Sequence, residues 1–218
     1  MVSLARTLGP PVLGTLLFLF GGSAQAVTTL FANLTTDQEL VPIVPTTSTG
    51  DPRPESFGTA TFVIDDAMTF MSWTATVFNI DFGGQTADAN DDLTVAHIHG
   101  PAPIGSGAGV IWGFFGLPFN DTTPNDVVVT PFSSGVGGTI SGKWDLPEGN
   151  NTTFADQLPN ILAGLTYMNF HTTQFGSGEI RGQIQVVPEP ETYLLMLAGL
   201  AGVGAMFRRR LGATLAKE

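Results

Sequence analysis

The middle of this chain alternates hydrophobic and polar residues with a period of two. The alternating segments are rich in Val, Ile, Thr and aromatic residues, and stretches rich in Gly, Pro, Asp and Asn separate them. This pattern is typical of half-buried β-strands joined by turns. It predicts eight strands, at residues 28–34, 57–64, 70–80, 93–99, 110–115, 138–146, 165–171 and 179–186. Several short strands with turn signals between them favour an all-β fold, a single antiparallel β-sandwich of Greek-key type.

One segment, residues 154–163, has the signals of a helix instead. Thr153 is suited to the N-cap, Asp156 lies at the capping-box position, and Gly164 is suited to the C-terminal stop. Pro159 lacks a backbone N–H, so we expect it to limit this helix to one or two turns.

The N-terminus has the pattern of a secretory signal peptide. Arg6 supplies the positive charge, residues 12–20 are mostly Leu, Val and Phe, and Ser23-Ala24-Gln25-Ala26 is a small-residue cleavage site. We therefore predict that residues 1–26 are a signal peptide, cleaved after Ala26.

The C-terminus combines three features in a fixed order. Pro188, Glu189 and Pro190 are followed by an apolar run at 194–207 and by Arg208, Arg209 and Arg210. Fourteen apolar residues are fewer than the roughly 20 that span a membrane, but the arginines match the positive charge of cytoplasmic flanks. A C-terminal hydrophobic helix is predicted, with residues 211–218 as a short cytoplasmic tail.

This order resembles the PEP-CTERM sorting signal, here at 188–210. The resemblance implies a transient anchor in the inner membrane of a Gram-negative bacterium, recognised by an exosortase-type processing enzyme. The alternative is an ordinary C-terminal membrane anchor.

Charge narrows the choice of partners for residues 27–187. This segment has 3 basic and 16 acidic residues, so its net charge is 3 − 16 = −13. Nucleic acid is excluded as a partner, because proteins bind phosphates through Lys and Arg. Exopolysaccharide and cations remain as candidates. The chain has no cysteine, so disulfides, thiolate ligands and a Cys nucleophile are excluded.

The three histidines are the main candidates for chemistry. His97 and His99 share one face of a strand, and an H-x-H pair on a strand is a geometry found in metal sites. The last two strands, paired as a hairpin, would place His171 opposite Glu179 and Asn169 opposite Arg181. Zn or Cu bound by His97, His99 and His171, with Glu179 or water as a fourth ligand, is therefore one interpretation. A second interpretation is structural: the histidines form hydrogen bonds to the backbone at strand ends, and Glu179 pairs with Arg181 or His171. A third interpretation is a pocket for an unknown polar ligand.

Other motifs in the sequence are weaker evidence for a function. Asp88, Asp91 and Asp92 form an acidic loop that suits either weak Ca²⁺ binding or plain solvation. Tryptophans at 73, 112 and 144 fit the core better than a sugar-binding surface. The chain has no recognisable serine-hydrolase motif, P-loop or catalytic carboxylate pair, so we expect a protein that is not an enzyme.

Several motifs in order resemble the CHRD domain, named from the repeats of chordin. They are Phe31-x-x-Leu34, Gln38–Pro42, Gly58-x-Ala60, Ala96–Pro101, Asn169–Thr172 and Gly178–Gln183. The resemblance covers about residues 28–186 and implies an extracellular β-sandwich, while the bacterial members have no agreed activity. The chain departs from the family by Gly/Asp-rich insertions around 81–92 and 117–127.

Together these features predict an exported binding or structural module at the cell surface or in the exopolysaccharide matrix. The alternative is an exported metal-binding protein, with an oxidoreductase as one form of it.

Overall fold

The strands form one antiparallel sheet, to which a short α-helix is added. The computed structural model describes residues 27–188, 193 and 196–204. Within that part the elements are β1 (Thr28–Thr35), the 3₁₀ helix η1 (Thr36–Gln38), β2 (Phe57–Ile64), β3 (Phe70–Phe78), β4 (Leu93–His99), β5 (Val110–Phe115), β6 (Val128–Pro131), β7 (Gly137–Asp145), α1 (Phe154–Leu162), β8 (Thr166–Thr172) and β9 (Ile180–Val186).

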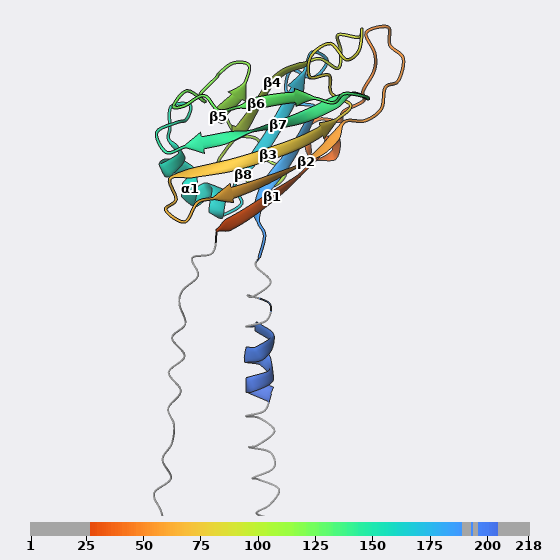
Figure 1. The fold of residues 1–218 in the computed structure, drawn as a ribbon. Helices are drawn as coiled ribbons and strands as arrows, with labels where there is room; N and C mark the ends of the chain where they lie inside the picture. The colour runs from red at the N-terminus through yellow and green to blue at the C-terminus, as the bar shows by residue number, and fades with distance from the viewer. Residues whose placement is uncertain (1–26, 189–192, 194–195, 205–218) are drawn as a thin grey trace, which may run out of the picture.

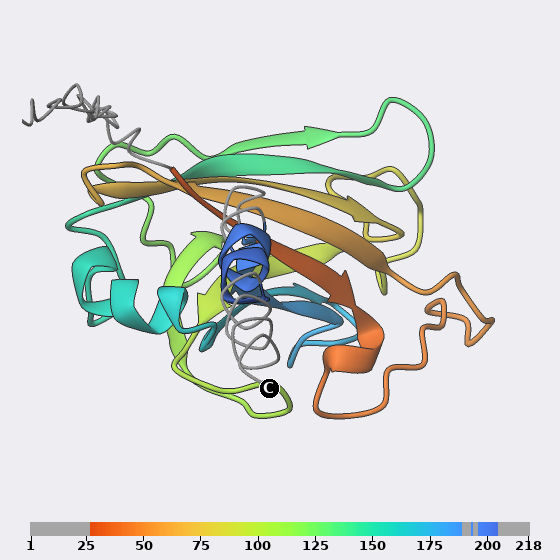
Figure 2. The same ribbon diagram turned by 90° about the horizontal axis from the view of Figure 1, so that it is seen from below.

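The sheet has the strand order β5-β4-β8-β9-β1-β2-β3-β7-β6 and curls so that its two halves face each other. Figure 2 shows the two layers, with β1 running between them. Trp112 on β5 packs against Trp73 on β3 and Trp144 on β7, with ring centroids 6.0 and 5.4 Å apart. The predicted antiparallel β-sandwich is therefore confirmed, and both of its layers belong to one continuous sheet.

The alternation that predicts the strands also matches the burial of their side chains. On β1, Leu30, Ala32 and Leu34 are buried, and on β9 Ile180 and Ile184 are buried beside them. Full burial of a Leu, Ile or Phe side chain stabilises a fold by about 1.5–3 kcal/mol. The three tryptophans belong to this core, as predicted.

Two local predictions need correction. Strand β6 was not predicted, because it has four residues and ends at Pro131, at the edge of the sheet. Helix α1 runs for nine residues past Pro159, longer than the expected one or two turns. It has the predicted capping box between Thr153 and Asp156, and its buried Phe154 packs against Trp144, which holds the helix on the core.

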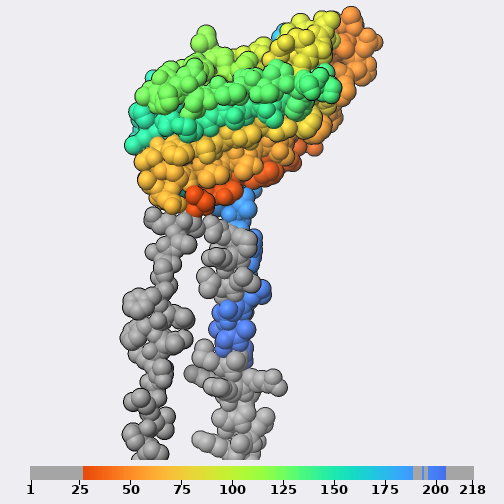
Figure 3. Space-filling model, viewed as in Figure 1, coloured from red at the N-terminus to blue at the C-terminus, as the bar shows by residue number. Residues whose placement is uncertain are grey.

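The two ends of the chain leave the sheet next to each other, because β1 and β9 are neighbouring strands. Figure 3 shows β1, β2, β3 and β7 as successive bands across one face.

The predicted signal peptide and residues 189–190 and 208–210 of the sorting signal lie outside the described residues. Tyr193 and residues 196–204 are helical and exposed. No helix within the described part is both long and apolar enough to cross a membrane.

Candidate metal centre

The three histidines lie on the face of β4 and β8 that points away from the hydrophobic core. These strands are antiparallel neighbours, with His97 opposite Asn169 and His99 opposite Tyr167. Alternate residues such as Ile98 and Phe170 face the core. His97, His99 and His171 nevertheless expose only 4, 8 and 6% of their surface. Loops must therefore cover this outer face.

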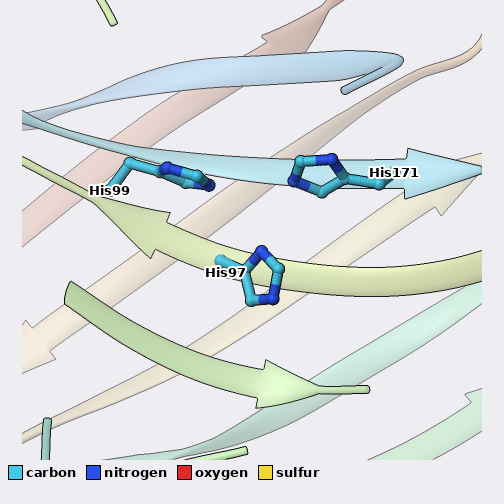
Figure 4. A group of neighbouring side chains, drawn as sticks. All are labelled: His97, His99 and His171. Carbon is cyan, nitrogen blue, oxygen red and sulfur yellow. The ribbon is translucent and has the colours of Figure 1, made fainter. Parts of the chain in front are cut away.

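The three imidazole rings surround a common space (Figure 4). Their centroids are 5.6 Å apart for His97 and His99, 5.2 Å for His97 and His171, and 5.9 Å for His99 and His171. One ring nitrogen from each histidine lies within 4.8 Å of one from each of the others. The structure thus brings together the three residues that the sequence singled out.

Each ring is held by a backbone carbonyl from a different loop. The Nε2 atom of His97 donates to the carbonyl of Leu117 at 3.1 Å. The Nδ1 atoms of His99 and His171 donate to the carbonyls of Ala108 and Gly176, at 3.0 and 3.1 Å. A carbonyl can only accept, so these three nitrogens carry the hydrogen. The predicted hydrogen bonding of the histidines to backbone is confirmed.

The opposite nitrogen of each ring has no partner. Nδ1 of His97 and Nε2 of His99 and His171 are buried and make no hydrogen bond within the described residues. In a neutral ring these atoms are lone-pair acceptors, and a buried acceptor without a partner costs about 1–3 kcal/mol. Three such acceptors around one space form a site for a cation or for a hydrogen-bond donor.

Burial keeps the rings neutral. Desolvation, followed by the neighbouring His171, lowers the pKa of His97 to about 4. Desolvation likewise lowers the pKa of His99 to about 4, against the opposing effect of its bond to Ala108. The pKa of His171 is lowered for the same reason. At neutral pH all three lone pairs are therefore available, and metal binding would displace no proton from them.

The donor set fits Zn²⁺ or Cu²⁺. Imidazole nitrogen is a good ligand for both ions, and three histidines are the protein ligands of several catalytic zinc sites. Metal-binding histidines usually donate their second N–H to a carbonyl or carboxylate, the arrangement seen at all three rings here. Tetrahedral Zn–N bonds of about 2.0–2.1 Å place the nitrogens roughly 3.4 Å apart. Small ring movements would bring the three atoms to that separation.

Glu179 does not join this group. Its carboxylate is fully buried and accepts hydrogen bonds from Arg53 at 2.6 Å, Thr172 at 2.6 Å and Ser56. The predicted pairing with Arg181 or His171 is wrong, and Glu179 is not placed to be a fourth metal ligand. Position 179 precedes β9, and its side chain reaches Arg53 in the loop before β2.

The loops that hold the rings were not predicted as part of the site. Leu117 lies in the insertion at 117–127, which therefore has a structural role at His97. That loop passes so close to β5 that a Cβ atom at Gly113 would lie 1.8 Å from the carbonyl oxygen of Pro118. The sequence signal for this contact is a glycine inside an otherwise aromatic and β-branched strand.

The acidic loop is arranged differently from its prediction. The carboxylates that lie together are Asp81, Asp91 and Asp92, whereas Asp88 accepts hydrogen bonds from the backbone of Ser48 and Asn90. Both oxygens of Asp81 accept backbone N–H groups, from Gly83 and Thr86. This bonding accounts for the burial of Asp81 without a cation.

Two family models match the chain. The model of the CHRD domain matches residues 30–184, which is well over half of the chain, and the model of the PEP-CTERM protein-sorting motif matches residues 186–210. Comparison with curated proteins and with solved structures gave no match.

Proposed function

This chain belongs to the CHRD domain family, and we propose that its domain binds one Zn²⁺ or Cu²⁺ ion through His97, His99 and His171. A CHRD domain followed by a PEP-CTERM motif makes the chain an exported protein sorted by an exosortase-type enzyme. The proposal adds a metal-binding role, without catalysis, at the cell surface or in the exopolysaccharide matrix.

One observation carries the metal-binding proposal. Each of the three buried rings has one nitrogen fixed by a backbone carbonyl and the other without a partner. Histidines that serve only as hydrogen-bond donors would not need their three free nitrogens to meet. An ion held by all three would remove the cost of burying these acceptors.

The experiment is metal titration of the purified protein after treatment with a chelator. We expect one equivalent of Zn²⁺ or Cu²⁺ to bind by calorimetry and to raise the melting temperature. Free metal at 1,000 times its Kd would add about 4 kcal/mol to the free energy of unfolding. His99→Ala should abolish both binding and the rise in melting temperature.

Asp91→Asn is the matched control, because it alters the carboxylate group formed by Asp81, Asp91 and Asp92. Metal binding unchanged in this variant would assign the ion to the histidines. Binding lost in Asp91→Asn but kept in His99→Ala would place the metal at the carboxylates. No binding to the unaltered protein would refute the proposal and favour the purely structural module.

A further inference from the structure

A cavity of about 470 Å³ opens beside the three histidines, with His99 in its wall. Its floor is formed by side chains of β8 and β9, and its rim by the segments around residues 40 and 108. Its lining includes His99, Tyr167, Asn169, Arg181 and Glu39. A ligand in this cavity would therefore lie next to an ion held by the histidines.

Arg181 brings a buried positive charge to this cavity. It exposes 5% of its surface and donates hydrogen bonds to the backbone carbonyls of Gln38 and Ser106. Among the described residues no carboxylate oxygen lies within 4.0 Å of its guanidinium nitrogens. Buried arginines are normally paired with an anion. The guanidinium of Arg181 is therefore a candidate partner for an anion from solution.

Glu39 lies in the same cavity but is a poor counter-ion. Burial raises the pKa of its carboxyl to about 7, although Arg181 acts in the opposite direction. One of its oxygens, Oε1, is buried without a hydrogen-bond partner within the described residues. The raised pKa makes Glu39 a weaker counter-ion for Arg181 than an ordinary carboxylate would be.

The strand register connects Arg181 to the histidines. His97, Asn169 and Arg181 lie opposite one another on the adjacent strands β4, β8 and β9. The guanidinium of Arg181 packs over the ring of Tyr167 at 4.7 Å, and that ring stacks on His99 at 4.9 Å. Asn169, between them, is 3% exposed, and its side-chain Nδ2 group is a hydrogen-bond donor. One small molecule above Asn169 would therefore meet both the ion and Arg181.

We propose that this cavity binds a small anion, which coordinates the metal ion held by the three histidines and pairs with Arg181. This inference rests on the proposed function. Three protein ligands leave a fourth position open on a tetrahedral ion, and ligands from solution bind there. Monoanions of the size of azide or a short carboxylate are small enough for the cavity, and the Nδ2 group of Asn169 could donate a hydrogen bond to them.

Azide binding to the Cu²⁺-loaded full chain tests the inference, because coordinated azide adds a charge-transfer band to the visible spectrum. We expect a saturable band in the unaltered protein. Arg181→Gln should weaken azide binding at least tenfold while changing Cu²⁺ affinity less than threefold. Arg181→Lys, which keeps the charge, should weaken it less. Lys143→Gln is the matched control: it removes one positive charge from a half-exposed site away from the cavity and should leave azide binding unchanged.

Asn169→Asp provides a second test that does not depend on the folding of Arg181→Gln. It keeps the size of the side chain and adds a negative charge beside the fourth position, so azide binding should weaken at least tenfold. An unaltered protein that binds neither Cu²⁺ nor Zn²⁺ would refute the metal site itself. Cu²⁺ binding without an azide band, or equal azide affinity in Arg181→Gln and the unaltered protein, would overturn the anion site alone.

Discussion

Protonation of the histidine rings should reduce the free energy of unfolding at acid pH. In the protein free of metal, His97 and His99 have a pKa of about 4, compared with 6.5 for an unperturbed ring. Between these values the unfolded chain binds more protons, so the free energy of unfolding decreases as the pH falls from 6.5 towards 4. Above 6.5 the three rings make no pH-dependent contribution.

His99→Gln tests this effect by chemical denaturation at pH 7.5 and pH 5 in the presence of a chelator. The variant should lose less stability between the two pH values than the unaltered protein, by about 1–2 kcal/mol. Glu39 acts in the opposite direction, because its raised pKa makes the fold more stable as the pH falls from 7 towards 4.5. The comparison between the two proteins cancels that contribution. An equal loss of stability in both would contradict the neutral, buried state of His99.

The sequence pattern predicted part of the site. The parts that it did not predict depend on contacts between residues far apart in the chain. The period of two placed His97 and His99 on one face, and the hairpin pairing of β8 and β9 placed Asn169 opposite Arg181, as observed. The role of Glu179 was missed because its partner Arg53 is 126 positions away, in a loop without a periodic pattern. Likewise, no local rule predicts which loop carbonyl meets which ring nitrogen.

The conformation of the loop at 116–120 depends on Gly113 in the neighbouring strand β5. The amide of Gly113 donates to Oδ1 of Asn120 at 3.0 Å, and its carbonyl accepts from the amide of Asn120 at 2.8 Å. These bonds fold the loop back over β5 and bring the carbonyl of Leu117 to His97. A side chain at position 113 would occupy the space of the Pro118 carbonyl.

Gly113→Ala should therefore displace the loop and reduce the free energy of unfolding by about 2–4 kcal/mol. The loss of the Leu117 contact should also change the tautomer of His97, which ¹⁵N chemical shifts of the ring report. Gly109→Ala is the control, because a Cβ atom there meets no atom within 4 Å. Equal stability of the two variants, with an unchanged His97 spectrum, would show that the loop does not need this glycine.

The strands were predictable from sequence because each buries one face, so that alternation is required along its length. This requirement is weakest for β6, where four residues at the sheet edge carry little pattern. The loops at 81–92 and 116–120 are held instead by hydrogen bonds that the Asp81 carboxylate accepts and by one that the Gly113 amide donates. Such bonds leave no periodic trace in a sequence.

The chain combines a CHRD domain with a PEP-CTERM sorting motif, and its charged residues are unevenly distributed along the sequence. Residues 27–187 carry 3 − 16 = −13, whereas the entire chain carries −11, because five of its eight basic residues lie in the terminal segments. A strongly acidic domain attracts cations from solution. This field would assist the proposed capture of a metal ion after export, and the buried histidines would add selectivity that surface carboxylates lack.

The sorting motif should determine whether the chain is released from the inner membrane. Replacement of Pro188, Glu189 and Pro190 by alanine should prevent recognition by the exosortase-type enzyme while preserving the apolar run and Arg208–Arg210. The chain should then accumulate at full length in the inner membrane, because the positive-inside rule predicts that the arginines would keep its C-terminus on the cytoplasmic side. Immunoblots of membrane and released fractions measure the distribution.

His99→Ala is the matched control for sorting, since it alters the domain and leaves the signal intact. It should be released as the unaltered protein is, which would separate sorting from metal binding. Normal release of the triple-alanine variant would mean that the tail acts only as a membrane anchor. Retention of both variants would instead show that release depends on the folded domain, because a destabilised domain exposes apolar strands that favour retention and degradation.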